Sequence, residues 1–459
     1  MKRLPLSLLA HWAGGELLGD DLVIGSLTHD TRALVPGSLY VALRGERFDG
    51  HDFAYDASMR GAAAVLVDHE VKVDVPQVVV PDTLLALARI AAGLQRDRVE
   101  KTVAITGSNG KTSVKTLVVS ILQRAGVTYF NPGNRNNEIG LPMAVIDGPD
   151  DADFSVYEMG AGKPGDIAYL TDIVTPEVAL VNNIAAAHLE RMGTLMGVAE
   201  TKGAIYDALP ADGTAVINAD DAFAEYFASR VPDRRILRFG LEATADLTAR
   251  DIRATADGSD FVLVAPHGEV AVELHLPGRH NVLNALAAAG IAMACGVSLA
   301  IIAEGLSAAQ PVAGRQIAHT LPNGAVVIDD SYNANPGSLV AAIDTLAAAS
   351  KQAGGEGWLV LGDMRELGAD EEALHADMGM RAKNAGLRRL YTLGPLSAAA
   401  AAAFGEGAHS FQDHASLADA LRADLRAGVR CLVKGSRGSA MDRIVAALLS
   451  TGEDASHAA

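Results

Sequence analysis

A glycine-rich segment between two regular patterns restricts the fold of this chain more than any other feature. The β-branched, apolar run at residues 102–106 stops at Gly107, and apolar residues then recur with helical spacing from position 114 to position 122. The first pattern is typical of a strand and the second of a helix with one buried face. Residues 107–112 therefore form a tight loop between them, and a unit of this kind usually belongs to a parallel sheet.

This loop, called the P-loop below, carries the residue types that bind a polyphosphate. Backbone N–H groups at a helix start attract phosphate, while Lys111 can contact the β- and γ-phosphates and Thr112 can bind Mg²⁺. Gly107 and Gly110 lie two positions closer together than the glycines of the usual Walker motif, so a glycine turn with a solvated lysine is the alternative. We expect an ATP site with contacts from Gly107, Ser108, Asn109, Gly110, Lys111, Thr112 and Ser113.

The chain is long enough for several domains. Its 459 residues correspond to about three domains of roughly 100–200 residues each, and 49% hydrophobic with 20% charged residues exclude global disorder. Short β-like runs alternate with helical stretches, which predicts an α/β fold. We expect a small α/β domain at residues 1–98, a central domain with a mainly parallel sheet at 99–312 and a Rossmann-like domain at 313–459.

The charge balance and the cysteine content exclude other classes of protein. With 38 Lys and Arg against 56 Asp and Glu, the net charge of −18 disfavours nucleic acid as a partner, so any phosphate site must be built locally. Cys295 and Cys431 provide neither a disulfide framework nor a cysteine metal cluster. The apolar stretch at 285–303 contains glycines and suits a buried helix pair better than a membrane span. We expect a cytoplasmic monomer without an export signal or a membrane span.

Several further motifs occur in an order that resembles the Mur ligase superfamily, whose members are ATP-dependent enzymes that join a carboxylate to an amine. Besides the shortened P-loop, these motifs lie at residues 133–142, 157–160, 182–184, 188–190, 202–203, 278–285 and 314–315. Segments 30–32, 36–43 and 49–51 are similar to the family's UDP-sugar-binding domain. The resemblance covers nearly the whole chain and implies a UDP-binding first domain, a central P-loop-containing ATPase domain and a C-terminal ligase domain.

The resemblance also implies roles for three residues beyond the P-loop. Glu158 and His188 match metal ligands that act beside Thr112, and Lys111, His188 and Lys202 match catalytic positions, with Lys202 carbamylated in related ligases. On residue chemistry alone, other roles stay open. Glu158 could form a salt bridge at a strand end, His188 could be a packed or capping residue, and Lys202 could be a surface lysine on a helix.

Further positions match nucleotide and substrate contacts of the family. Asn281, Arg315 and Asp330 correspond to ATP contacts, although Arg315 could equally form a linker salt bridge and Asp330 could cap a helix. The loop at 434–439 could bind an anion such as a peptide carboxylate, or it could be a simple glycine turn. The substrate contacts implied by the resemblance are Asp30, Thr31, Arg32, Asn134, Asn137, Tyr332, Asn333 and Asn335.

Within the superfamily, residues 329–336 are most similar to the enzymes that add D-alanyl-D-alanine to UDP-N-acetylmuramoyl-tripeptide through an acyl phosphate, in peptidoglycan precursor synthesis. The lysine- or diaminopimelate-adding ligase is an alternative, but its Asp-Asn-Pro-Arg segment is absent. A folate polyglutamate ligase and an ATP-binding protein without ligase activity are further alternatives. No motif marks the third residue of the tripeptide.

Overall fold

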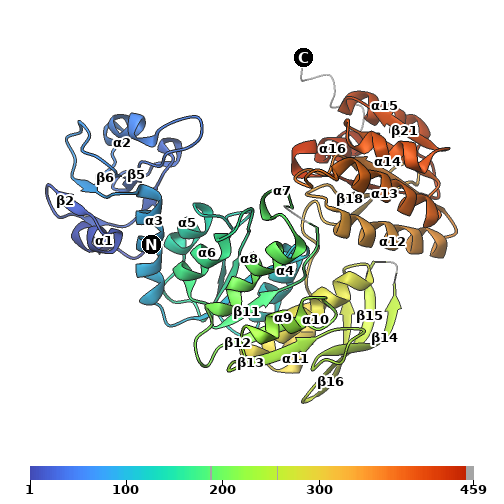
Figure 1. Ribbon diagram of the computed structural model, residues 1–459, viewed down its shortest axis with the longest axis horizontal. Coiled ribbons are helices and arrows are strands. Elements are labelled where there is room, and N and C mark those ends of the chain that lie inside the picture. Colours follow the sequence, from blue (N-terminus) through green and yellow to red (C-terminus); the bar gives the residue numbers. More distant parts are fainter. Residues whose placement is uncertain (187–188, 256, 451–459) are drawn as a thin grey trace.

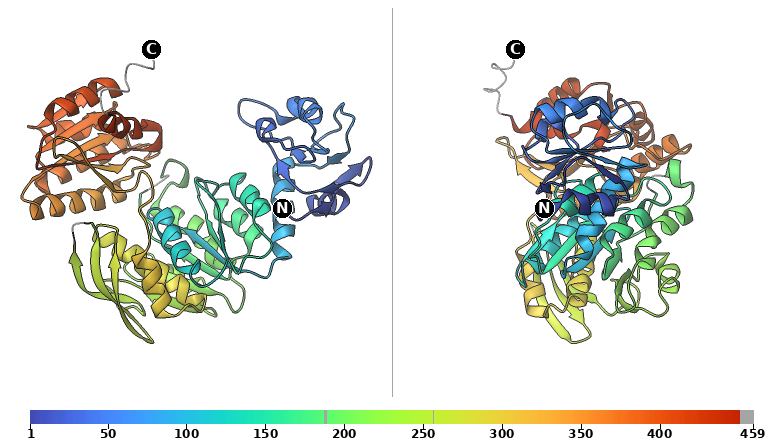
Figure 2. Two further views of the ribbon diagram at one scale, coloured as in Figure 1. Left: turned by 180° about the vertical axis from the view of Figure 1, so that it is seen from behind. Right: turned by 90° about the vertical axis from the view of Figure 1, so that its left-hand side faces the viewer.

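The computed structural model describes residues 1–186, 189–255 and 257–450. Three α/β units follow one another along the chain, and the N-terminal and C-terminal units stand at opposite ends of the central one (Figures 1 and 2). The expected α/β class is confirmed. Among the described residues, no helix combines the length and the apolar character that crossing a bilayer requires.

The N-terminal unit is a five-stranded sheet in which only the edge strand β2 runs antiparallel to its neighbour. A separate antiparallel pair, β1 and β3, lies near the chain start. The strands are β1 (Leu4–Pro5), β2 (Glu16–Leu18), β3 (Val23–Ile24), β4 (Leu27–Thr28), β5 (Leu39–Val41), β6 (Ala64–Val67) and β7 (Gln77–Val79). The helices are α1 (Leu6–Ala13), η1 (Thr31–Ala33), η2 (Gly50–Phe53), α2 (Ala54–Met59) and α3 (Thr83–Arg96), the last of which leads into the central unit.

The central unit contains a six-stranded, wholly parallel sheet in the order β13-β12-β11-β8-β10-β9, as the alternation of strand and helix patterns predicts. These strands are β8 (Lys101–Thr106), β9 (Thr128–Phe130), β10 (Phe154–Glu158), β11 (Val178–Val181), β12 (Thr214–Asn218) and β13 (Arg235–Phe239). Successive β8 residues point to opposite faces of the sheet: Val103 and Ile105 pack in one core cluster, and Ala104 packs in the other. Helices therefore cover both faces.

One face of this sheet is covered by α4 (Lys111–Leu122), α10 (Arg279–Ala294) and α11 (Leu299–Ser307). The last two span the stretch 285–303, which the sequence predicts as a buried helix pair, and extend beyond it at both ends. The other face is covered by α3, α5 (Gly140–Asp147), α6 (Asp166–Val174), α7 (Leu189–Met192), α8 (Leu195–Asp207) and α9 (Ala224–Ser229). The pattern analysis missed an antiparallel sheet of β14 (Thr248–Ala254), β15 (Ser259–Ala265) and β16 (Gly268–Leu274), which packs on α11.

The C-terminal unit is Rossmann-like, with a six-stranded sheet in the order β17-β18-β22-β19-β20-β21 and only β17 antiparallel. The strands are β17 (Ile317–Thr320), β18 (Val326–Asp330), β19 (Glu356–Gly362), β20 (Arg389–Leu393), β21 (Ala408–Phe411) and β22 (Val429–Lys434). One face carries α12 (Pro336–Gln352), α13 (Glu371–Asn384) and α14 (Ser397–Phe404), and the other carries α15 (His414–Asp424) and α16 (Asp442–Leu449). The short turn η3 (Arg437–Ser439) follows β22.

Candidate active site

A cavity of about 750 Å³, called the main cavity below, opens between the central and C-terminal units. Loops that follow β8, β10 and β11 form much of its wall on the central side, and loops that follow β18 and β22 form it on the C-terminal side. Open parallel sheets bind ligands at the carboxyl ends of their strands. Both sheets thus present this edge to the same cavity.

The P-loop forms one wall of the main cavity, as the sequence predicts. Gly107 and Gly110 have φ angles of 146° and 78°. A Cβ at Gly107 would lie 3.0 Å from the Cβ of Asn182, and a Cβ at Gly110 would lie 2.5 Å from Asn182 Nδ2. Both positions therefore require glycine. Gly110 is the N-cap of α4, so the positive end of this helix adjoins the cavity.

Lys111 bends back over the P-loop. Its Nζ donates a hydrogen bond to the Gly107 carbonyl at 2.8 Å. Burial lowers the pKa of Lys111, the Glu158 carboxylate opposes this shift, and the Arg315 guanidinium adds to it. An anion bound in the main cavity would act as the counter-ion of the Lys111 ammonium.

Glu158 ends β10 beside the first turn of α4. Its Oε2 accepts a hydrogen bond from Thr112 Oγ1 at 2.9 Å, and its Oε1 accepts one from Asn136 Nδ2 at 3.0 Å. Burial alone would raise the pKa of Glu158, but the charges of Lys115 and Lys111, together with these hydrogen bonds, hold it below its ordinary value. An ionised carboxylate beside a hydroxyl is a pair of hard oxygen donors, which is the chemistry that Mg²⁺ prefers.

Lys202 lies on α8 with 1% of its surface exposed. Its pKa is lowered well below the ordinary value because burial disfavours the ammonium and the charge of Lys111 repels it, while Asp166 opposes the shift. This helix lysine is therefore not on the surface. His188 lies outside the described residues, and its predicted metal and catalytic roles stay predictions.

Residues near the start of the C-terminal unit reach the P-loop side of the main cavity. Arg315 Nη2 donates a hydrogen bond to Thr112 Oγ1 at 2.9 Å, and its Cζ lies 4.5 Å from the ring centroid of Tyr332. Asp330 is buried and accepts a hydrogen bond from Lys434 Nζ at 2.6 Å. Arg315 thus bridges the units, while Asp330 forms an ion pair within the C-terminal sheet.

Asn281 lines the main cavity from the first turn of α10, but its amide already has partners. Nδ2 donates to the Pro277 carbonyl at 2.8 Å, and Oδ1 accepts from Asn284 Nδ2 at 3.1 Å. These two bonds use one of the two N–H groups and one of the two oxygen lone pairs of the amide, so a purine contact does not require either bond to be exchanged. Its role as a nucleotide contact stays a prediction.

Comparison with known proteins gives the same organisation. Three family descriptions match in order: "Mur ligase family, catalytic domain" at residues 23–95, "Mur ligase middle domain" at 105–292 and "Mur ligase, glutamate ligase domain" at 314–437. The chain belongs to the Mur ligase family. UDP-N-acetylmuramoyl-tripeptide--D-alanyl-D-alanine ligase of Escherichia coli (strain K12) is 44% identical over 98% of this chain and 100% of its own length. The protein of that name from Haemophilus influenzae is 37% identical over 98% and 99%.

Solved structures of Mur ligases share the whole architecture. MurF from Acinetobacter baumannii superposes with a TM-score of 0.92 at 32% identity, covering 98% of this chain and 99% of that one. MurF ligase from Thermotoga maritima in complex with ADP superposes with a TM-score of 0.83 at 27% identity, covering 92% and 96%. The similarity therefore extends over all three units of this Mur ligase.

The predicted substrate contacts of this Mur ligase fall into two groups. The first lines the main cavity and consists of Asn134, Asn137, Tyr332, Asn333 and Asn335. The second, Asp30, Thr31 and Arg32, lies in the N-terminal unit, where Asp30 caps η1 and pairs with Arg32 at 2.8 Å. The structure does not bring the second group to the main cavity.

Sequence reasoning missed Lys115, one turn after Lys111 on α4. Its Nζ lies 3.4 Å from Glu158 Oε2 and donates a hydrogen bond to the Asn131 carbonyl at 3.0 Å, with about 5% of the residue exposed. Lys115 therefore joins the candidate metal ligand to the segment after β9. A cation among the apolar residues of the helix was the available signal, since buried lysines need a partner.

Two asparagines after β11 hold the apex of the P-loop, a role that the motif at 182–184 did not reveal. The backbone N–H of Asn109 donates to Asn183 Oδ1 at 2.9 Å. The Asn109 carbonyl accepts from Asn182 Nδ2 at 3.0 Å and from Asn183 Nδ2 at 3.2 Å. The loop is thus preorganised by a neighbouring strand end.

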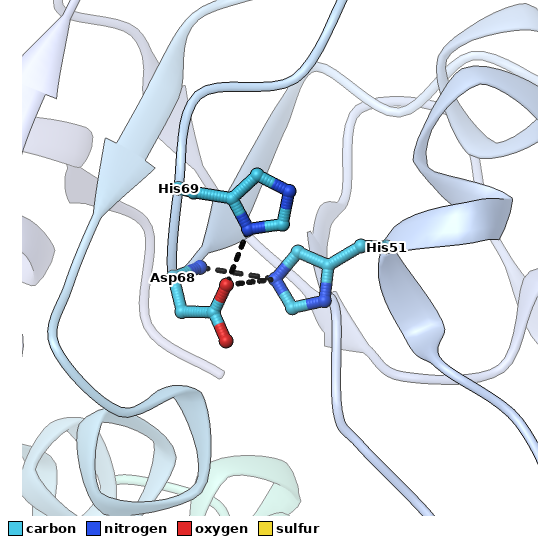
Figure 3. Close-up of side chains that lie close together, drawn as sticks. All are labelled: His51, Asp68 and His69. Carbon is cyan, nitrogen blue, oxygen red and sulfur yellow. Dashed lines mark hydrogen bonds and ion pairs between the residues drawn. The ribbon is translucent and has the colours of Figure 1, made fainter.

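A second cluster of titratable groups lies in the N-terminal unit (Figure 3), and its geometry argues against a metal. The atoms that His51, Asp68 and His69 could offer lie within 4.8 Å of one another. However, His51 Nε2 accepts the backbone N–H of Asp68 at 3.0 Å, and Arg44 donates to both Asp68 oxygens at 2.8 and 3.1 Å. Hydrogen bonding to Arg44 is the main reason why the pKa of Asp68 lies below its ordinary value. We infer that these residues hold the loop before η2 in place against β6.

Proposed function

We propose that this chain is an ATP-dependent ligase that joins D-alanyl-D-alanine to UDP-N-acetylmuramoyl-tripeptide in peptidoglycan precursor synthesis. The observation that carries this proposal is the full-length similarity, 44% identity over 98% of the chain, to a relative with that name. The main cavity supports it, because the P-loop, a hard-oxygen pair and cationic side chains from two units converge there.

The reaction needs activation because a carboxylate is a poor acyl donor. An oxygen of the tripeptide's terminal carboxylate attacks the γ-phosphorus of ATP, and ADP leaves. The free amine of D-alanyl-D-alanine then attacks the acyl phosphate, loses a proton, and phosphate leaves as the amide forms. Phosphoryl transfer depends mainly on positioning and charge neutralisation. Lys111 and the P-loop N–H groups would hold the phosphates, and Arg315 would exchange its bond to Thr112 for one to phosphate.

Mg²⁺ fits the donor set of this site. Thr112 and Glu158 would hold it, together with the predicted ligand His188, and it would neutralise phosphate charge when bound. The pairing of Lys115 with Glu158 keeps that carboxylate ionised before any cation arrives.

We propose that Lys202 acts as a carbamate. Its burial and lowered pKa favour the neutral amine, which is the form that reacts with carbon dioxide. The product places an anion near Lys111 where the neutral amine carried no charge, and this anion can bind or orient a cation. A permanently protonated lysine in this position would repel both Lys111 and a bound Mg²⁺.

We also propose a division of labour along the chain. Residues 1–98 bind the UDP-muramyl substrate, 99–312 bind ATP and Mg²⁺, and 313–459 receive the dipeptide. Because described residues of a single chain build the main cavity, we expect a monomer to suffice. Its place is the cytoplasm, where the free thiols of Cys295 and Cys431 stay reduced.

Phosphate release from ATP tests the proposal. UDP-muramyl tripeptides ending in lysine or in diaminopimelate are each combined with D-alanyl-D-alanine, and UDP-muramyl dipeptide is combined with free lysine or diaminopimelate. We expect release only with a tripeptide and D-alanyl-D-alanine together, and the preferred tripeptide identifies the third residue. Equal stimulation in the dipeptide reactions would place the chain with the lysine- or diaminopimelate-adding ligases. Nucleotide binding without amine-dependent release would indicate a protein that binds ATP without ligation.

A further inference from the structure

One asparagine of the C-terminal unit uses both ends of its amide, once within its own helix and once across to the P-loop. Asn335 Oδ1 accepts the backbone N–H of Ser338 at 2.9 Å, which caps α12. Its Nδ2 donates to Asn109 Oδ1 at 2.8 Å, although the two residues lie 226 positions apart. α12 is the helix of the C-terminal unit that lies towards the central unit (Figure 1).

Asn109 is well placed to transmit position between the units. Its backbone is already fixed to the central sheet, because Asn182 and Asn183 bind its N–H and carbonyl groups. Its side chain is the part of the loop apex that turns to the C-terminal unit. A shift in the position of the loop apex would therefore shift the start of α12, and a shift of α12 would likewise act on the apex.

The first turn of α12 approaches the apex closely. A Cβ at Gly337 would lie 3.2 Å from Asn109 Nδ2 and 3.2 Å from the Ala185 Cβ. Asn335 and Ser338 form a capping box, and Pro336 occupies the first turn, so this end of the helix has a defined conformation. The hydrogen bond thus joins two rigid elements.

We propose that the Asn109–Asn335 hydrogen bond couples nucleotide binding in the P-loop to the position of the C-terminal unit. The inference rests on one part of the proposed function, that the P-loop binds a nucleotide, and it does not depend on which amine the enzyme uses. Asn335 is then a positioning residue rather than the substrate contact that the sequence predicts. A nucleotide that favours the apex conformation in which Asn109 meets Asn335 stabilises the docked C-terminal unit, and by linkage the docked unit raises the affinity for nucleotide to the same extent.

The expected size follows from the chemistry of the contact. An uncharged hydrogen bond between two side chains contributes roughly 0.5–1.5 kcal/mol, which corresponds to about a two- to tenfold change in nucleotide affinity. Removing either partner should produce this change, and removing both should produce no more than removing one.

The test is a double-mutant cycle on ADP affinity, measured by calorimetry in the absence of muramyl peptide and dipeptide. Asn335→Ser keeps an uncharged N-cap but is too short to reach Asn109. Asn109→Ala removes the other partner and leaves α12 untouched. Lys351→Ala, in the last turn of α12, is the matched control. Small-angle scattering of each protein with and without ADP reports the position of the C-terminal unit.

We expect both single variants and the double variant to bind ADP about two- to tenfold more weakly, with a smaller ADP-dependent change in radius of gyration, while Lys351→Ala matches the parent. Additive effects, or unchanged affinity in Asn109→Ala, would overturn the coupling. If Asn335→Ser lowers the unfolding temperature, Asn109→Ala and its scattering profile still decide. If D-alanyl-D-alanine fails to stimulate phosphate release in the substrate panel while the double-mutant cycle still shows coupling, only the proposed amine is contradicted.

Discussion

Replacing Lys115 with methionine removes the buried ion pair behind the candidate metal site, together with the hydrogen bond from its Nζ to the Asn131 carbonyl. The two side chains have similar length, so the substitution removes the charge and leaves most of the packing in place. In the native chain, Lys115 Nζ lies 3.4 Å from Glu158 Oε2, and the exposed fractions of the two side chains are 6% and 5%. The variant therefore leaves Glu158 buried without its nearest cation.

The magnitude follows from the distance and the burial. Two unit charges 3.4 Å apart attract by about 5 kcal/mol at an effective dielectric constant of about 20. Removing one partner of a buried pair usually costs about 3–5 kcal/mol. Lys111 and the hydrogen bonds from Thr112 and Asn136 still support Glu158, so we expect the lower end, about 3 kcal/mol. At about 2–4 °C per kcal/mol for a domain of this size, the unfolding temperature should fall by about 6–12 °C.

Thermal unfolding without nucleotide, followed by circular dichroism, measures this effect. Lys101→Met is the matched control, because Lys101 pairs with Glu177 at 2.9 Å in the same unit but the side chains are 37% and 33% exposed. Exposed pairs contribute about 0–1 kcal/mol, so the unfolding temperature of this variant should fall by about 4 °C or less. Equal losses in the two variants would refute the argument that burial makes the Lys115 pair important.

Further variants test other parts of the site. Lys111→Ala should lower turnover by at least about 10³-fold, and phosphate-release rates within tenfold of the parent would contradict its phosphate role. Lys202→Ala should be nearly inactive and should partly recover its activity in acetate but not in chloride, while Lys202→Arg stays inactive. Equal effects of acetate and chloride on Lys202→Ala would contradict the carbamate role. Gly110→Ala should lose ADP binding in calorimetry, because a left-handed alanine costs about 1–2 kcal/mol and its Cβ would lie 2.5 Å from Asn182 Nδ2; wild-type affinity would refute the steric argument. Burial lowers the pKa of His280 from 6.5 to about 4. Between these two pH values the unfolded chain binds a proton that the folded chain does not, so the free energy of unfolding falls as the pH drops. Urea unfolding at pH 7 and 5 should show a loss of up to about 2 kcal/mol that is smaller in His280→Gln, and equal losses would contradict this linkage.

The sequence predicts best what depends on local pattern. Val103 and Ile105 belong to a β-branched run, and Gly107 and Gly110 bracket the loop that follows, so strand, loop and helix were predicted from neighbouring residues alone. The antiparallel sheet after β13 escaped prediction, although β15 alternates buried residues such as Phe261 with more exposed ones. Its strands contain many charged residues, which hide this weaker period-2 signal.

Roles that depend on distant partners could not be predicted in this way. Lys115 acquires its function from Glu158 and Asn131, which come from two other strand ends. Asn335 reaches Asn109 only because two separate sheets present their carboxyl ends to one cavity. The motifs placed these residues near a site, but spacing along the chain contains no information on which side chains face each other.

The distribution of charge explains how a chain with a net charge of −18 can bind a polyphosphate. Two buried lysines of the site are matched by carboxylates, Lys115 by Glu158 and Lys434 by Asp330. Within the described ranges, no carboxylate lies at ion-pair distance from Lys111 or Lys202, and both have lowered pKa values. The matched pairs set the geometry, whereas the ammonium forms of Lys111 and Lys202 are disfavoured by burial and because neither has a counter-charge at that distance. Nucleotide phosphates would provide a counter-charge for Lys111, and a carbamate would make one unnecessary at Lys202. Ligand binding therefore relieves a local electrostatic cost at these two lysines. The acidic surface cannot offset this cost, because charges further away than a Debye length of about 8 Å are largely screened.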